Sequence, residues 1–116
     1  MAFVSVARLD AIPSGGATCV KIEQIAVGLF RVGDRVHAME NACPHAGFPL
    51  SEGDLEGPRI VCAAHGFDYD VRTGFPPDSR DGFPIPCFAV KVERGEVWVD
   101  LEQRLNEPPK RERRGG

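Results

Sequence analysis

Hydrophobic and polar residues alternate along most of this chain, as they do in strands whose two faces meet different surroundings. Alternation or a short apolar run predicts strands at 3–9, 19–25, 27–32, 35–39, 59–62, 87–93 and 96–101. Within 19–25, Val20 and Ile22 are expected to point inward, with Ile25 as a third candidate. No window of about a dozen residues has a helical period. The pattern therefore predicts an all-β fold.

Two dipeptides predict tight turns between neighbouring strands. Gly33-Asp34 separates 27–32 from 35–39, and Arg94-Gly95 separates 87–93 from 96–101. Glycine at a two-residue turn supplies the positive φ that hairpins of this kind need. Both strand pairs are therefore expected to be antiparallel hairpins.

The strands fall into two groups, which suggests the organisation of the domain. A strand-rich framework covers roughly 1–39 and 83–103, and a loop-rich, glycine-punctuated part covers about 40–82. We interpret residues 1–103 as one domain, with the loop-rich part as a small subdomain. The polar, proline-containing stretch 104–116 is expected to be a flexible tail.

Composition narrows the classes of protein. With 116 residues, 42% of them hydrophobic, the chain fits one ordinary globular domain. A net charge of −3 argues against nucleic acid as the main partner. No apolar run is long enough to span a membrane and no leader precedes the first strand, so a cytoplasmic protein without a membrane partner is expected. Cys19 and Cys87 stand in apolar runs and are expected to be small buried residues.

Candidate chemistry lies in the loop-rich part, where two mixed pairs of metal-ligating residues occur. The pairs are Cys43-x-His45 and, after sixteen intervening residues, Cys62-x-x-His65. Two thiolates and two imidazoles suit a tetrahedral zinc ion, or a [2Fe-2S] cluster with both Cys on one iron and both His on the other. A structural zinc site usually draws a Cys pair from one knuckle and a His pair from another segment. One Cys and one His from each loop therefore favour the cluster, and zinc stays as an alternative.

At these residues the sequence resembles the Rieske family of [2Fe-2S] proteins, whose hallmark is a Cys-x-His loop followed by a Cys-x-x-His loop at this separation. Two further segments are similar to that family: HGFDYDVRTG (65–74) to its second-loop extension, and GFPIPCFAVKVERGEVWVD (82–100) to its proline segment and closing hairpin. The likeness covers about residues 35–101. It implies stacked antiparallel sheets, a β-sandwich framework, with a small cluster-binding subdomain.

The resemblance also implies roles for single residues. One [2Fe-2S] cluster would be bound by Cys43 and Cys62 on its inner iron and by His45 and His65 on its outer iron. The residues expected to surround these ligands are Gly47, Gly66, Phe67, Tyr69 and Pro84. Tyr69 matches a tyrosine whose hydroxyl can reach a ligand sulfur.

The same comparison indicates a low reduction potential. High-potential members of the family carry a disulfide where this chain has Phe48 and Ala64, and a serine hydroxyl where it has Phe67. Hydrogen bonds to a cluster favour its reduced, more negative state, so their absence lowers the potential. Within the Rieske range of about −150 to about +300 mV, we expect a value below roughly 0 mV.

By this resemblance the chain is an electron-transfer protein, the ferredoxin component of a dioxygenase system. It would carry one electron from a flavin reductase to a terminal, ring-hydroxylating-type oxygenase. It is not expected to be an enzyme, because the chain has no room for a mononuclear iron domain and no dinucleotide-binding fingerprint. A first alternative is a Rieske-like small subunit of a larger reductase, such as assimilatory nitrite reductase. A second is a zinc-stabilised interaction module.

An acidic belt between residues 52 and 81 suggests the charge of a redox partner. It consists of Glu52, Asp54, Glu56, Asp68, Asp70, Asp78 and Asp81, against Arg59, Arg72 and Arg80. Such a belt is expected to steer a basic partner surface.

Overall fold

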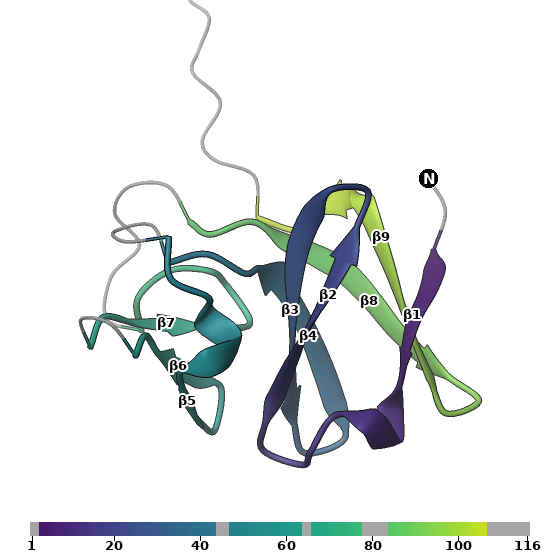
Figure 1. The fold of residues 1–116 in the computed structure, drawn as a ribbon, viewed down its shortest axis with the longest axis horizontal. Coiled ribbons are helices and arrows are strands. Elements are labelled where there is room, and N and C mark those ends of the chain that lie inside the picture. The colour runs from purple at the N-terminus through teal and green to yellow at the C-terminus, as the bar shows by residue number, and fades with distance from the viewer. Residues whose placement is uncertain (1–2, 44–46, 64–65, 78–83, 107–116) are drawn as a thin grey trace, which may run out of the picture.

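The computed structural model describes residues 3–43, 47–63, 66–77 and 84–106, and these form an all-β fold of two antiparallel sheets (Figure 1). The strands described are β1 (Val4–Arg8), β2 (Ala17–Ile22), β3 (Ile25–Val32), β4 (Arg35–Glu40), β5 (Asp54–Glu56), β6 (Arg59–Val61), β7 (Asp68–Asp70), β8 (Cys87–Glu93) and β9 (Glu96–Arg104). Single 3-10 turns stand at Leu9–Ala11 and Leu50–Glu52. The predicted fold class is confirmed. Within the described ranges, no helix has the length and apolarity needed to cross a membrane.

The framework is one continuous six-stranded sheet in the order β1-β9-β8-β4-β3-β2. One face of every strand contributes to a single hydrophobic cluster, so the sheet must curl around it. This framework core consists of Ile12, Ile22, Val27, Leu29, Val36, Ala38, Phe88, Val97 and Val99, with partly buried β1 and β8 residues against it.

A second, three-stranded sheet in the order β5-β6-β7 packs beside the framework (Figure 1). The cluster between the two sheets, here called the site core, consists of Phe30, Met39, Cys43, Leu50, Ile60, Cys62, Tyr69, Val71, Ile85 and Cys87. Side chains of a strand alternate between its faces. β3 therefore sends Leu29 to the framework core and Phe30 to the site core, and β4 divides Ala38 and Met39 in the same way.

Both predicted hairpin turns are present. Val32 pairs with Arg35 around Gly33, which has φ +62°, and Glu93 pairs with Glu96 around the second turn. In that turn Arg94 and Gly95 both have positive φ, at +55° and +76°. Two consecutive left-handed residues give a hairpin whose twist matches the flanking strands.

The prediction of a single strand at 19–25 is wrong, because a hairpin turn interrupts this stretch. Glu23 and Gln24 have φ of +50° and +76°, and Ile22 pairs with Ile25 across them. Ile22 is buried as expected, whereas Ile25 begins β3 and is 36% exposed. The turn lacks glycine, so the hydrophobic pattern ran through it without a break.

Three further features differ from the sequence-based expectation. The short strands β5 and β7 were not predicted; they flank β6, which corresponds to the strand predicted at 59–62. Cys19 is exposed on β2, although Cys87 is buried as expected. Contacts with the framework also extend past residue 103, since the Leu105 N–H donates to the Cys87 carbonyl at 2.8 Å. Residues 107–116 of the expected tail lie outside the described ranges.

Two glycines of the small sheet give a test of its packing. Gly57 has φ +58° and open space around it, whereas a Cβ at Gly53 would run into the backbone carbonyl oxygen of Val61. We expect Gly57→Ala to cost about 1 kcal/mol of stability through backbone strain. Gly53→Ala should cost at least about 2 kcal/mol, because the backbone of β6 must move. Urea unfolding of both variants measures this, and equal losses would contradict the packing argument.

Candidate metal centre

The two ligand loops have the same backbone hydrogen-bond pattern. The Cys43 N–H donates to the Phe48 carbonyl at 2.9 Å, and the Gly47 N–H donates back to the Cys43 carbonyl at 2.7 Å. In the second loop the Cys62 N–H donates to the Phe67 carbonyl at 2.7 Å, and the Gly66 N–H donates to the Cys62 carbonyl at 3.0 Å. Gly47 and Gly66 fill the same place with φ of +67° and +77°, a conformation in which glycine is unstrained. Each loop is thus a tight turn closed on its cysteine.

Both cysteines are buried in the site core. Each is 1% exposed, and neither forms a disulfide. Tyr69 of β7 lies beside them: its hydroxyl shares a hydrogen bond with the Cys43 sulfur. Burial is the larger cause and the proximity of Cys43 the second, and together they raise the pKa of Tyr69 to about 12. The hydroxyl therefore stays protonated at neutral pH and can donate a hydrogen bond to the Cys43 sulfur.

The predicted histidine ligands His45 and His65 lie outside the described residues. Among the residues that are described, no group of three or more His, Cys, Asp or Glu gathers as it would around a metal ion. The structure therefore brings together the two predicted sulfur ligands, and the four-residue ligand set stays a prediction.

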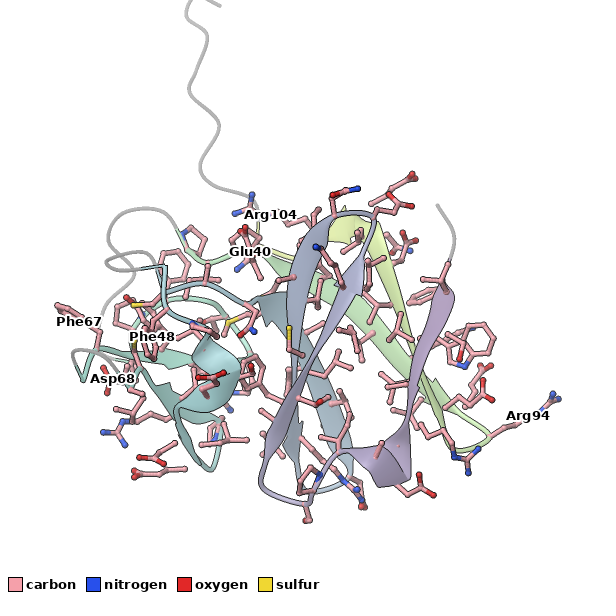
Figure 2. The ribbon with its side chains drawn as sticks, viewed as in Figure 1. Glu40, Phe48, Phe67, Asp68, Arg94 and Arg104 are labelled. Atoms are coloured by element: carbon pink, nitrogen blue, oxygen red, sulfur yellow. The ribbon has the colours of Figure 1, made fainter. Side chains whose placement is uncertain are left out.

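Of the other residues near the site, one is buried beside Cys43 and two are exposed. Pro84 is buried and lines a pocket of about 420 Å³ together with Cys43 and Gly47. Phe48 and Phe67, each five residues after its cysteine, are 37% and 43% exposed. Their rings lie at one end of the molecule, opposite the hairpin that carries Arg94 (Figure 2).

Sequence reasoning missed Asn41, which closes the first ligand loop. This side chain is buried; its Oδ1 accepts the Ser51 N–H at 2.7 Å and its Nδ2 donates to the Ser51 hydroxyl at 2.9 Å. Its own N–H donates to the carbonyl of Ala26 on the framework. An asparagine at the end of a strand often bonds nearby backbone in this way, which was the available signal.

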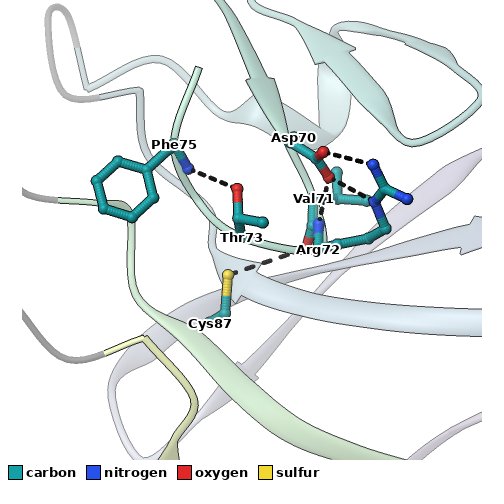
Figure 3. A network of polar contacts seen from close by, with 6 residues as sticks. All are labelled: Asp70, Val71, Arg72, Thr73, Phe75 and Cys87. Atoms are coloured by element: carbon teal, nitrogen blue, oxygen red, sulfur yellow. Dashed lines mark hydrogen bonds and ion pairs between the residues drawn. The ribbon is translucent and has the colours of Figure 1, made fainter. Parts of the chain in front are cut away.

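Much of the acidic belt is neutralised by its own arginines. Arg59 contacts both Glu56 and Asp68, with nitrogen–oxygen distances of 2.5 and 2.7 Å. Arg72 holds Asp70 through two hydrogen bonds, at 2.9 and 2.7 Å (Figure 3), and this pair lowers the pKa of the Asp70 carboxyl. The described part of the belt therefore carries less uncompensated charge than its composition suggests.

Comparison with known proteins decides the family. A model described as the Rieske [2Fe-2S] domain matches residues 2–89. The chain belongs to the Rieske [2Fe-2S] domain family. It is 41% identical over 78 residues to the ferredoxin CarAc of Metapseudomonas resinovorans, a match that covers 67% of this chain and 73% of that one.

Two further matches cover more of the chain. The ferredoxin component of the naphthalene 1,2-dioxygenase/salicylate 5-hydroxylase systems of a Ralstonia species is 33% identical over 103 residues, covering 86% of this chain and 96% of the relative. Among solved structures, one titled as a complex of reduced oxygenase and oxidized ferredoxin in carbazole 1,9a-dioxygenase matches with a TM-score of 0.79. Its matched chain is 34% identical, and the match covers 90% of this chain and 97% of that one.

The donors present fit the cofactor of this family, a [2Fe-2S] cluster bound by Cys and His. Two buried thiols without a disulfide stand in matching turns, and thiolate is the ligand that iron–sulfur clusters require. The glycine four positions after each cysteine adopts a positive φ without strain, which lets both turns close in the same way.

Tyr69 provides a test of how the surroundings tune this Rieske centre. We expect Tyr69→Phe to lower the reduction potential by about 40 mV, since one hydrogen bond of about 1 kcal/mol to the Cys43 sulfur is lost from the reduced state. The ring stays in place, so the melting temperature should change little. Protein-film voltammetry near neutral pH measures the shift, and an unchanged potential would leave Tyr69 with a packing role only.

Proposed function

We propose that this chain carries single electrons on a Rieske [2Fe-2S] cluster, from a flavin reductase to a terminal ring-hydroxylating-type oxygenase. Cys43, His45, Cys62 and His65 are the proposed ligands. The observation that carries the proposal is the pair of matching turns around two buried cysteines that form no disulfide, within a chain of the Rieske family. The relatives named above are ferredoxins of oxygenase systems, at 33–41% identity.

In this role the protein acts chiefly through positioning and shielding. When bound, the cluster accepts and returns one electron without a change of substrate bonds. The two backbone turns fix the directions of the cysteine sulfurs, and the Tyr69 hydroxyl donates a hydrogen bond to that of Cys43. Burial of both thiols in the site core keeps water from the sulfurs, which holds their surroundings apolar.

A contact surface for partner proteins is proposed at the tip formed by Phe48 and Phe67. Large apolar side chains that remain exposed beside a functional centre commonly mark interaction sites. Both residues follow a proposed ligand loop directly, so a partner that covers them comes close to the centre (Figure 2).

We favour a carrier over the other roles that the sequence leaves open. The named relatives are components of oxygenase systems, which supports a separate carrier more than a fixed small subunit of a nitrite-type reductase. A carrier of this kind has no substrate site of its own, and we propose that it is not an enzyme. A cytoplasmic setting is also proposed, since Cys19 is an exposed free thiol of the kind that reducing compartments preserve.

The ligand assignment is tested with all three histidines of the chain. The purified protein should be red-brown, with two iron and two acid-labile sulfide per chain, as expected for one [2Fe-2S] cluster. His45→Ser and His65→Ser should each abolish or reshape its visible and EPR spectra. His37→Ser is the matched control and should leave them unchanged, because His37 pairs with Phe30 within the framework sheet.

Two results would contradict this proposal. Zinc without iron or sulfide would favour the interaction module. Turnover of an aromatic substrate by the chain alone, with a chemical reductant and oxygen, would show an enzyme rather than a carrier.

The charge of the belt predicts how the carrier responds to salt. Within the described residues, Glu52 and Asp54 are exposed and form no ion pair, whereas Glu56 is held by Arg59. Reduction by the reductase of a naphthalene dioxygenase system should slow as salt rises past about 0.1 M, where the screening length is about 10 Å. The double variant Glu52→Gln/Asp54→Asn should weaken this dependence more than Glu56→Gln does. Rates that ignore ionic strength would leave the belt with a solvation role only.

A further inference from the structure

Asn106 joins three segments of the chain around the metal centre. Its Nδ2 donates to the carbonyls of Thr73 and Ile85, both at 2.7 Å, and its Oδ1 accepts the Cys87 N–H at 2.8 Å. Arg104 also donates to Oδ1, at 3.3 Å. A primary amide has two N–H donors and one carbonyl acceptor, so all of its hydrogen-bonding groups are in use.

One of those bonds reaches the segment Pro84-Ile85-Pro86, which faces the same pocket as Cys43, and another holds Cys87 directly after it. This proline segment lines the pocket of about 420 Å³ that it shares with Cys43. Proline has no N–H, so the segment has a single backbone donor, that of Ile85. It therefore cannot form a strand ladder of its own, and its position depends on bonds from elsewhere.

The proline segment is held by bonds to the turn after β7 and to the end of β4. The Ile85 N–H donates to the Gly74 carbonyl at 3.0 Å, and the Pro86 carbonyl accepts the N–H of Glu40 at 2.9 Å. Arg104 donates to the Pro84 carbonyl at 3.5 Å. The remaining link, to the Ile85 carbonyl, is the amide of Asn106.

Gly74, Ile85 and Asn106 pack too closely to admit an added side chain at Gly74. Gly74 has φ +81°, and a Cβ there would run into the Ile85 carbonyl oxygen and lie 2.5 Å from the Asn106 nitrogen. Thr73, whose carbonyl bonds Asn106, stands in the turn that follows β7, the strand of Tyr69 (Figure 3). One side chain therefore fixes the proline segment relative to the strand that contacts Cys43.

We propose that Asn106 is a positioning residue for the metal centre, which holds the proline segment against Cys43 and keeps water from its sulfur. The inference rests on the proposed function. It concerns a residue beyond the span 2–89 that the family model matches.

The test compares the cluster-loaded Asn106→Ala variant with the wild-type protein. Without the amide the segment loosens and water reaches the sulfur, which favours the more negative, reduced state. The reduction potential should therefore rise, with the ratio of reduced to oxidised protein at a fixed potential up about threefold, or about 30 mV for one electron. Iron loss to a chelator should become at least about fivefold faster, as for other residues that support metal ligands.

Two controls separate positioning from general stability. Val99→Ala opens a cavity in the framework core and should lower the melting temperature while leaving the potential unchanged. Leu105→Ala alters an adjacent side chain that is 64% exposed, and should change neither quantity. Asn106→Ser keeps one hydroxyl for one of the carbonyls and should give an intermediate potential; it also replaces the alanine variant if that one does not fold.

The outcomes bear on the two proposals separately. An unchanged or lowered potential in both Asn106 variants, or an equal rise in Val99→Ala, would overturn the positioning role while the carrier function stands. A wild-type protein that binds no cluster would overturn the proposed function itself.

Discussion

Side chains along β3 and β4 alternate between the two hydrophobic cores of the molecule. These two strands form a wall shared by both cores, since successive residues face the framework core and the site core in turn. Phe30 and Met39 are fully buried on the side of the metal centre, and Leu29 and Ala38 are buried on the other. A shift of one residue in register would exchange the two sets and disrupt both cores together.

This shared wall explains how very short strands can support a metal centre. β5, β6 and β7 have three residues each, too few for a stable sheet in isolation. Ile60 and Tyr69, the central residues of β6 and β7, are buried in one cluster with Phe30 and Met39, so the framework supplies the apolar surface that the small sheet lacks. The local geometry of the cysteines thus rests on long-range packing.

That dependence also sets what the sequence could predict. Gly33-Asp34 and Arg94-Gly95 were predictable because glycine marks a turn by its own conformational freedom. The Glu23-Gln24 turn was not, because its residues carry no such signal and the pairing of β2 with β3 imposes their positive φ. For the same reason β5 and β7 escaped detection, since their stability comes from the site core rather than from their own pattern.

In the candidate site, too, some residues could be predicted from the sequence and others could not. Spacing alone pointed to Cys43 and Cys62, because metal ligation requires particular atoms at particular separations. Asn106 was missed because it stands in a polar, charged stretch whose composition indicates a tail, and its role depends on three backbone groups far away in the sequence. Composition describes what a segment can form by itself. It gives no sign of a side-chain amide that hydrogen-bonds to the backbone of other segments.

The matching turns connect the surface of the tip to its interior. Phe48 and Phe67 turn their rings toward solvent, while their carbonyls accept the N–H groups of Cys43 and Cys62. The same two residues therefore belong both to the exposed apolar tip and to the backbone that orients the buried thiols. Because each turn is closed by only a few backbone hydrogen bonds, a partner that packs on either ring rests on a residue bonded directly to a cysteine. Each exposed ring is thus linked to a buried cysteine of the metal centre through one backbone hydrogen bond.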